Sequence, residues 1–237
     1  HLSGTSLYLS KDYEHFAEAV RSLRTSFILS GIDKPHQVTL VTSSLPNEGK
    51  TTLSENLALA MGQMERVLLI DADMRRPSLA AQFGFPASTE GLAELVAGTA
   101  SLEVCTQRLE KQGLDLITAG AVPSNPLDLL TSRRFDALLS ELRQNYDRII
   151  IDSAPTQAVS DSLMLSAKCD AVIYVVKADS TATNVVVNGL QRLMRVGAPI
   201  IGVVLNQFDS NVAARYGYAA SDGANYYGYG YASKPYS

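Results

Sequence analysis

Residues 38–53 read VTLVTSSLPNEGKTTL. The opening stretch, residues 38–42, is apolar or β-branched throughout, which is typical of a strand covered on both faces. A polar loop follows, and a helical pattern begins near Leu53. In a Walker A loop, backbone N–H groups and the positive N-terminus of the following helix bind phosphate. The strand, loop and helix found here have that arrangement, so we predict a phosphate-binding loop over residues 44–51.

The side chains of this loop have distinct expected roles. The ammonium group of Lys50 should reach the β- and γ-phosphate oxygens, and the hydroxyl of Thr51 should ligate Mg²⁺. The consensus begins with Gly where this sequence has Ser44, so the pattern fails at one position. An ordinary loop entering a helix is the alternative, and the buried strand before it favours the phosphate site. The predicted nucleotide-binding residues are Ser44, Pro46, Asn47, Glu48, Gly49, Lys50, Thr51 and Thr52.

Three acidic residues lie at the ends of two other apolar runs. Residues 149–152 end in Asp152, which is the form of a Walker B element whose carboxylate holds Mg²⁺. Residues 67–71 end in Asp71, and Asp73 follows at i+2 on the same side. Two like charges there would repel each other unless a metal ion or a proton lies between them. One acid could assist Mg²⁺ while the other accepts a proton from an attacking hydroxyl. A helix cap and a polar turn are the structural alternatives at these positions.

Further apolar runs alternate with helical patterns along the chain. This alternation predicts a mostly parallel sheet with right-handed crossovers and helices on both faces. The predicted fold class is a three-layer α/β domain of the P-loop NTPase type. The predicted strands are residues 38–42, 67–71, 114–118, 149–152, 171–176 and 200–206, and the predicted helices are residues 50–63, 126–144, 160–167 and 182–196.

Another helix is predicted before the first strand, because an apolar stripe recurs there at spacings of three and four residues. The members of the stripe are Phe16, Val20, Leu23 and Phe27. Glu18, Arg21 and Arg24 lie on a different face at successive i, i+3 steps. On spacing alone, a solvated helix face is the simplest interpretation of these charges.

Composition excludes several classes of protein. The 237 residues are 46% hydrophobic and 19% charged, which suits a globular body. The net charge of −4, without basic clusters, argues against a nucleic-acid partner. Cys105 and Cys169 lie far apart, so neither a disulfide framework nor a zinc site is indicated, and a reducing, cytosolic setting fits. We find no membrane-spanning run or signal sequence, and because the chain begins at His1 we expect a processed chain or a piece of a longer one.

The end of the chain has a different composition from the body. Seven of the eleven tyrosines follow residue 215, interleaved with Gly, Ala, Ser and Asn, while Leu, Ile and Met are absent after residue 210. Such a segment cannot build a core that offsets the entropy of ordering, so we expect residues 211–237 to be flexible. The seven tyrosines are Tyr216, Tyr218, Tyr226, Tyr227, Tyr229, Tyr231 and Tyr236.

These motifs together resemble the bacterial tyrosine kinases, which are the autokinase domains of polysaccharide co-polymerases. Residues 44–51 look like that family's Walker A loop, residues 69–75 are similar to its Walker A′ element, and residues 149–155 resemble its Walker B element. The tyrosine-rich tail completes the likeness. Because Ser44 stands where the Walker A consensus has its first glycine, the details of the loop stay open.

Two further segments carry the same resemblance. The E-x-x-R-x-x-R pattern formed by Glu18, Arg21 and Arg24 matches the family's oligomerisation helix, so the resemblance replaces the interpretation of that face as merely solvated. Residues 120–126 also look familial, with Asn125 placed to cap a helix that begins at Pro126.

The resemblance implies an ATP-dependent autokinase that phosphorylates the tyrosine cluster of a neighbouring subunit in a ring. It makes Lys50, Asp71, Asp73 and Asp152 the catalytic residues, with Asp71 as the expected base. It assigns Mg²⁺ to Thr51, Asp73 and Asp152, and adenine contact to Asn206. ATP or ADP and Mg²⁺ are the implied cofactors. Arg75 belongs to the matched element but receives no role.

The resemblance also implies partners and a place in the cell. We expect a homo-oligomeric ring formed through the helix at residues 13–30, a membrane-anchored activator segment fused upstream or on a separate chain, and a cognate tyrosine phosphatase. The domain would then act at the inner face of the cytoplasmic membrane. Ring formation and tail phosphorylation should oppose each other, because each phosphate adds about −1.5 to −2 charges. The expected divisions of the chain are an N-terminal extension at residues 1–12, a kinase domain at 13–210 and a tail at 211–237.

Two other functions remain open. A partition- or septum-type ATPase would share the fold, but such proteins carry an extra lysine five positions before the Gly-Lys lysine, where this chain has Leu45. Their basic or amphipathic membrane-binding helix is also missing from the tail. Alternatively, the domain could bind nucleotide only to assemble a scaffold. The intact acids at 71, 73 and 152 argue against a domain that has lost its catalytic activity.

Overall fold

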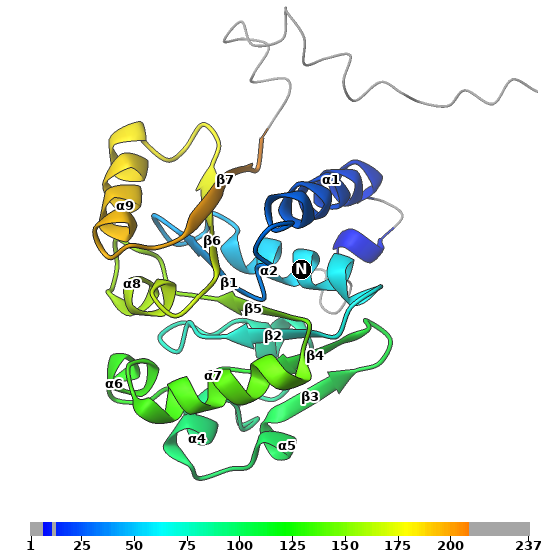
Figure 1. The fold of residues 1–237 in the computed structure, drawn as a ribbon, viewed down its shortest axis with the longest axis vertical. Coiled ribbons are helices and arrows are strands. Elements are labelled where there is room, and N and C mark those ends of the chain that lie inside the picture. The colour runs from blue at the N-terminus through cyan, green and yellow to red at the C-terminus, as the bar shows by residue number, and fades with distance from the viewer. Residues whose placement is uncertain (1–6, 11–12, 209–237) are drawn as a thin grey trace, which may run out of the picture.

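Seven strands in the described part of the chain form one sheet. The computed structural model describes residues 7–10 and 13–208, so all seven tail tyrosines lie outside the described residues. In spatial order the strands are β3 (Thr106–Leu109), β4 (Leu114–Ile117), β2 (Val67–Asp71), β5 (Arg148–Asp152), β1 (Val38–Ser43), β6 (Ala171–Lys177) and β7 (Ile200–Asn206) (Figure 1).

The sheet is parallel except at one edge, where β3 pairs antiparallel with β4. The six strands predicted from the sequence are confirmed, each within one residue at its ends. Strand β3 was not predicted, because its sequence Thr-Gln-Arg-Leu is polar and none of its residues is fully buried. The mostly parallel sheet is therefore a correct prediction that omitted one short edge strand.

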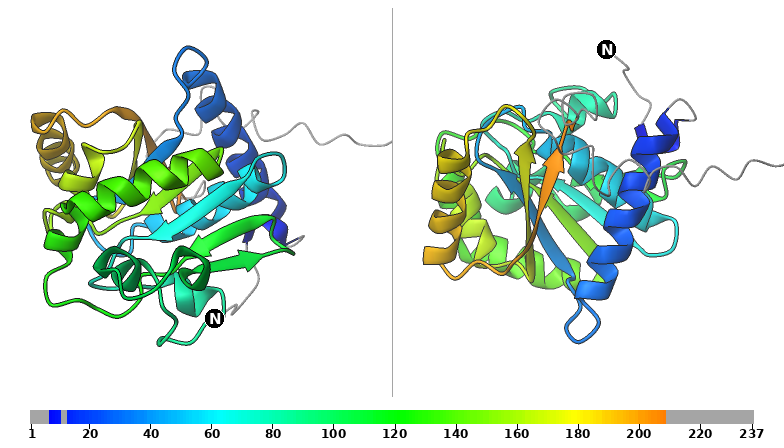
Figure 2. Two further views of the ribbon diagram at one scale, coloured as in Figure 1. Left: turned by 60° about the horizontal axis from the view of Figure 1, so that its bottom comes forward. Right: turned by 90° about the horizontal axis from the view of Figure 1, so that it is seen from above.

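Helices cover both faces of the sheet (Figures 1 and 2). One face carries the 3-10 turn η1 (Leu7–Leu9) with helices α1 (Glu14–Ser30), α2 (Lys50–Gly62) and α3 (Leu79–Gln82). The other face carries α4 (Leu92–Ala97), α5 (Leu102–Cys105), α6 (Pro126–Leu130), α7 (Arg133–Asn145), α8 (Asp161–Ser166) and α9 (Thr183–Arg195). None of the helices in the described part of the chain combines the length and apolar character that crossing a membrane requires.

The two helical layers explain why the strands are apolar at every position. On β2, Leu68 and Ile70 pack in the cluster under α4 to α9, whereas Val67 and Leu69 pack in the cluster under α1 and α2. Successive side chains of a strand point to opposite faces, so a strand covered on both sides must be apolar throughout. The predicted three-layer arrangement is confirmed.

Helix α1 lies on the body through the predicted stripe. Val20 and Phe27 are buried, and Phe16 and Leu23 pack against the same apolar cluster. The turn before it is also attached, because the side chain of Tyr8 is buried and its backbone N–H donates to Asn56 Oδ1 at 2.8 Å. The described part of the predicted N-terminal extension therefore packs on α2.

The prediction of one helix over residues 126–144 was wrong. The chain forms α6 and then α7, with a break at Thr131 and Ser132. The hydroxyl of Ser132 accepts a hydrogen bond from Phe135 N at 3.2 Å and so caps the second helix. Helix α6 does begin at Pro126, but Asn125 makes no side-chain capping bond, contrary to expectation.

The order of the strands creates the position for a ligand site. Strand β1 lies between β5 and β6, so the chain leaves β1 toward β2 on one side while β6 and β7 lie on the other. In open α/β sheets, such a switch point leaves a crevice beyond the carboxyl ends of the strands. The predicted phosphate loop follows β1 directly and therefore lies at this edge.

Candidate functional site

The loop after β1 has the backbone of a tight anion-binding turn. Asn47 and Gly49 both adopt positive φ angles, of 64° and 92°, and α2 begins at Lys50. A Cβ atom on Gly49 would lie 1.9 Å from the side-chain nitrogen of Asn206, so only glycine fits there. The N–H groups at the start of α2 thus lie at the edge of the sheet where the strands β1, β2 and β5 end.

Two residues of the loop contact acids from other strands. The ammonium nitrogen of Lys50 lies 3.2 Å from Asp73 Oδ2, just beyond β2. The hydroxyl of Thr51 donates to Asp152 Oδ2, at the end of β5, at 2.6 Å. Parallel strands present their carboxyl ends at one edge, so the fold brings together residues that lie 23 to 101 positions apart.

Asp152 is fully buried at the centre of this group. Its Oδ1 accepts a weaker bond from the hydroxyl of Ser54 at 3.3 Å, and its strand pairs it with Asp71. Burial raises the pKa of Asp152 from 3.8 to about 7, with the charge of Asp71 adding to the rise and Lys50 opposing it. The carboxyl group therefore gains stability when a cation approaches it.

Asp71 and Asp73 have different surroundings although they are two residues apart. The side chain of Asp71 is buried and accepts backbone N–H groups from Asp73 at 3.2 Å and from Ser78 and Leu79 at 3.0 Å each. Burial raises its pKa to about 6, although these three N–H donors oppose the rise. Asp73, by contrast, faces Lys50 and accepts Arg76 N at 3.1 Å.

The oxygen donors fit a magnesium nucleotide better than a metal held by protein alone. Within residues 7–10 and 13–208, no three His, Cys, Asp or Glu side chains form a ready-made metal centre. Mg²⁺ commonly keeps several waters and binds one or two carboxylates together with phosphate oxygens. The paired hydroxyl of Thr51 and carboxylate of Asp152 are donors of that kind. Asp73, which is expected to share the magnesium ion with Thr51 and Asp152, lies 3.2 Å from the Lys50 ammonium nitrogen, and its part as a metal ligand stays a prediction.

Ser44 occupies the position where the consensus has glycine, and its side chain points into the interior. Its hydroxyl lies 2.7 Å from the hydroxyl of Tyr174, which lies 3.3 Å from Thr156 Oγ1. Helix α9 packs closely on the Tyr174 hydroxyl, because a Cβ atom added to Gly189 would lie only 1.9 Å from it. The serine is accommodated because it has a buried hydrogen-bonding partner.

The other predicted loop residues divide between surface and interior. Pro46 and Asn47 are exposed, Thr52 is half-buried and Glu48 is buried. Asn206, at the end of β7, donates to the carbonyl oxygen of Glu48 at 2.9 Å. The structure therefore brings Asn206 to the phosphate loop, next to Gly49.

One ion pair at the site was not predicted as a pair. Arg75 binds the carboxylate of Asp161 through two nitrogens, at 2.8 and 3.2 Å. The side chain of Asp161 is 1% exposed and that of Arg75 is 41% exposed. The pair ties the segment after β2 to the start of α8. The only sequence signal was an acid at the start of a predicted helix, which does not reveal a distant partner.

Two of the three motif charges on α1 lie on the outside of the molecule. Arg21 and Glu18 form an exposed i, i+3 pair at 2.7 Å. Arg24 instead turns toward its own body and donates to the carbonyl of Ala60 in α2 at 2.8 Å. Whether these residues contact another copy stays a prediction.

Known proteins resemble this chain in sequence and structure. Residues 47–206 match the AAA domain family. YwqD of Bacillus subtilis, a tyrosine-protein kinase, is 31% identical over 203 residues, which cover 85% of each chain. EpsB of Ralstonia nicotianae is 37% identical over 221 residues, which cover 92% of this chain and 29% of EpsB. The crystal structure of the VpsO kinase domain superposes with a TM-score of 0.76 at 44% identity, covering 84% of this chain and 100% of that one. This chain thus spans less than a third of the length of EpsB.

Proposed function

The chain belongs to the AAA domain family and, within it, to the bacterial tyrosine kinases, and on this premise we propose that it transfers the γ-phosphoryl group of ATP to tyrosine hydroxyls. We place this activity in exopolysaccharide synthesis. One observation carries the proposal above the others: a lysine and a threonine of one phosphate loop each contact a carboxylate from a different strand. A lysine, a hydroxyl and carboxylates placed together in this way suit phosphoryl transfer, which depends on the positioning of the phosphates and on the stabilisation of their charge.

Each residue of the site has a proposed part in that reaction. Lys50 binds the β- and γ-phosphate oxygens, and the N–H groups of the loop hold the phosphates in place. Thr51 and Asp152 hold the magnesium ion, with Asp73 nearby. When bound, Mg²⁺ neutralises the negative charge that develops on the phosphates. Asn206 contacts the nucleotide from the end of β7.

Asp71 is the proposed base. Its raised pKa of about 6 leaves it mostly ionised at neutral pH, close to the range in which a carboxylate accepts a proton efficiently. The tyrosine proton passes to Asp71 as the phenolic oxygen forms its bond to the γ-phosphorus and the bond to the leaving ADP oxygen breaks. Asp73 then remains paired with Lys50 and keeps that ammonium group directed toward the phosphates.

The proposed acceptors are the tyrosines beyond residue 215, presented by a neighbouring copy. Glu18, Arg21 and Arg24 of α1 would form the contact between copies in a ring. We also propose a membrane-anchored activator segment and a tyrosine phosphatase as partners. Phosphates on several tyrosines would add negative charge to the ring, so phosphorylation would favour its dissociation.

Purified protein incubated with ATP and Mg²⁺ tests the activity, with the added mass of phosphate and phosphotyrosine as the readout. We expect phosphotyrosine in the wild type and none in Lys50→Met. If both gain none while still binding ADP, the domain is a nucleotide-binding scaffold. If ATP is hydrolysed without modification of tyrosine, the partition-type ATPase is the better assignment.

A mixing experiment tests the neighbouring-copy acceptor. One partner carries Lys50→Met with its tyrosines intact, and the other is active but has phenylalanine at all seven tail tyrosines. Phosphotyrosine on the Lys50→Met partner supports transfer between copies. Its absence, when the wild type is modified under the same conditions, rules that transfer out.

A further inference from the structure

Glu48 presents an electrostatic problem, because it is an acid in the middle of a loop built to bind anions. A carboxylate near phosphate oxygens repels them, and burying it costs free energy unless it is fully paired. The residue is nevertheless 2% exposed. Its side chain must therefore have a use that offsets both effects.

The carboxylate is held by three donors, none of which belongs to a charged side chain. Oε2 accepts the backbone N–H of Leu45 at 2.6 Å, across the loop. Oε1 accepts the backbone N–H of Lys177 at 3.3 Å and the hydroxyl of Thr181. Lys177 ends β6, and Thr181 lies in the segment before α9. The side chain therefore links the phosphate loop to the junction of β6 and α9.

The backbone of Glu48 is fixed as well. Its carbonyl oxygen accepts the side-chain N–H of Asn206 at 2.9 Å. The residues on either side, Asn47 and Gly49, have the positive φ angles that shape the turn. A positive φ is uncommon at a non-glycine residue, so the contacts around Asn47 help to define the turn.

We propose that Glu48 is a positioning residue that holds the loop in its phosphate-binding shape before nucleotide arrives, by anchoring it to Lys177 and Thr181. Both oxygens of the carboxylate accept hydrogen bonds from the protein itself. The inference rests on the proposed binding of nucleotide by this loop, but not on tyrosine being the acceptor.

Glu48→Gln is the sharpest test, because it keeps the size of the side chain and removes one acceptor oxygen. In either orientation of the amide, its NH₂ group faces a backbone N–H, that of Leu45 or that of Lys177, which then lacks its acceptor. We expect the Kd for ADP with Mg²⁺, measured by calorimetry, to rise about tenfold, equivalent to about 1.4 kcal/mol. The KM for ATP should rise in parallel while kcat stays within about twofold, because the shape of the loop serves substrate and transition state alike.

Two further variants separate positioning from general damage. Thr181→Val removes one of the three donors and should weaken ADP binding less than Glu48→Gln, and it should have a smaller effect when Glu48 is already Gln. Glu55→Gln makes the same chemical change on α2, where no described hydrogen bond involves that side chain, and should leave the Kd for ADP unchanged.

The outcomes are distinct. A raised Kd for ADP with coupling between Glu48 and Thr181 supports the proposal. An unchanged or lower Kd in Glu48→Gln overturns it, as does a fall in kcat at constant KM, which would place Glu48 in the transition state. If the wild type binds ADP but makes no phosphotyrosine, the proposed kinase function fails while this inference stands on the calorimetry.

Discussion

The phosphate loop and the outer face of α1 both carry charged residues at motif spacing, but their charges are arranged differently. In the loop region, Lys50 and Thr51 contact acids from other strands within a buried edge of the sheet. On α1, Glu18 and Arg21 contact each other on an exposed surface. A charge that is buried must be paired by its own fold, whereas an exposed pair contributes little to folding. The exposed pair on α1 therefore adds little to the stability of the single chain.

This comparison predicts different costs of mutation in the two regions. Changes at the buried site should alter chemistry and the free energy of unfolding together. Changes on α1 should alter assembly while leaving the stability of the single chain nearly constant.

Lys50→Met should have the largest effect. It removes the ammonium group beside Asp73 and should lower the initial rate of phosphotyrosine formation by on the order of 10³-fold. Quantitative mass spectrometry of the tail measures the rate. Thermal unfolding provides the control for folding. A folded Lys50→Met protein that retained more than a tenth of the wild-type rate would show that the contact at this edge is not catalytic.

Asp71→Asn should lower the rate by roughly 10²-fold, as expected for loss of a general base. In the wild type, kcat/KM should fall as pH drops below about 6, because protonated Asp71 cannot accept a proton. The part of the acidic limb that Asp71 causes should be lost in Asp71→Asn, while the part that follows from protonation of Asp152, whose pKa is raised to about 7, should remain; both parts should be kept in Asp73→Asn. If the limb disappears only in Asp73→Asn, the two acids exchange roles.

Asp152→Asn should stabilise the nucleotide-free protein at pH 8 while lowering the rate of the magnesium-dependent reaction. Burial raises the pKa of Asp152 from 3.8 to about 7, so its contribution to stability is full below pH 3.8 and is lost as pH rises through about 7. We expect a gain on the order of 1–3 kcal/mol in the free energy of unfolding at pH 8 and little change at pH 4, measured with urea.

Glu55→Gln is the matched control for that prediction. Burial raises the pKa of Glu55 to about 7 as well, so its substitution should also increase stability above pH 7. Because Glu55 lies outside the site, the rate of phosphorylation should not change. A loss of stability at pH 8 in Asp152→Asn would contradict this prediction. It would mean that the hydrogen bonds from Thr51 and Ser54 to the ionised carboxylate stabilise the fold by more than the burial of the charge destabilises it.

Arg75→Ala should reduce the free energy of unfolding by about 1–2 kcal/mol, because it leaves the buried carboxylate of Asp161 without its partner. The exposure of Arg75 lowers this estimate below that for a fully buried pair. Urea unfolding measures the change. The double variant with Asp161→Asn should recover part of the loss, and a double variant no more stable than Arg75→Ala would contradict this account.

Glu18→Gln combined with Arg21→Gln should change the free energy of unfolding by less than about 0.5 kcal/mol, while the mass measured by light scattering falls toward that of a single chain. Arg66 and Asp147 form another exposed pair, at 3.0 Å, which lies in the segments just before β2 and β5 and outside α1. Arg66→Gln should therefore leave the mass unchanged. If both changes lowered the measured mass equally, the charges on α1 would have no specific role in assembly.

The sequence was sufficient to predict the central strands and the loop after β1, because strands covered on both faces are apolar at every position. It was not sufficient for β3, whose polar residues pair only because β4 offers a free edge. The break between α6 and α7 was also missed, because it depends on Ser132 as a cap inside a continuous apolar pattern.

The candidate site divides in the same way. Lys50, Thr51, Asp73 and Asp152 were predicted from local motifs, and the fold brings them into contact. The partners of Ser44, Glu48 and Arg75 were not predicted. Each of these side chains bonds to a residue at least 86 positions away that belongs to no motif: Tyr174, Thr181 and Asp161. Contacts of this kind depend on the order of the strands, which local spacing does not reveal.

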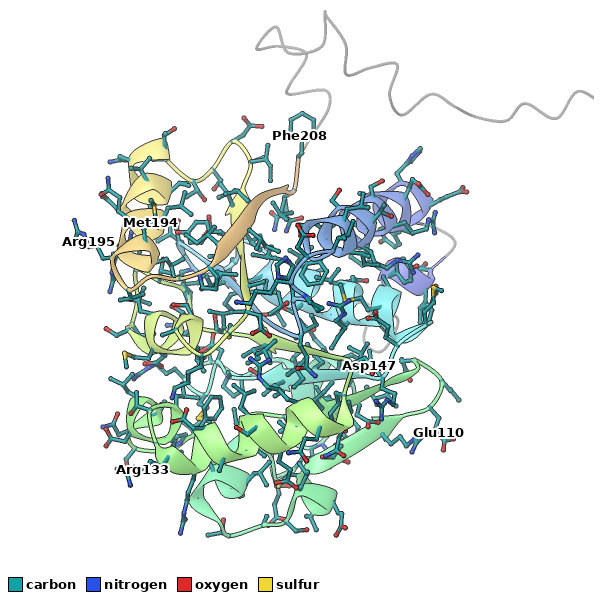
Figure 3. The ribbon with its side chains drawn as sticks, viewed as in Figure 1. Glu110, Arg133, Asp147, Met194, Arg195 and Phe208 are labelled. Carbon is teal, nitrogen blue, oxygen red and sulfur yellow. The ribbon has the colours of Figure 1, made fainter. Side chains whose placement is uncertain are left out.

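The bond between Asn206 and the phosphate loop has a consequence for the chain that follows it. The side chains of Asn206 and Gln207 donate to the carbonyls of Glu48 and Asn47, at 2.9 and 3.5 Å, and Phe208 ends the described chain (Figure 3). Residues 209–237 can span up to about 100 Å when extended. Every tyrosine among them is joined through the chain to a point beside the phosphate loop, so its effective concentration at that loop is limited by the length of the intervening chain and not by dilution.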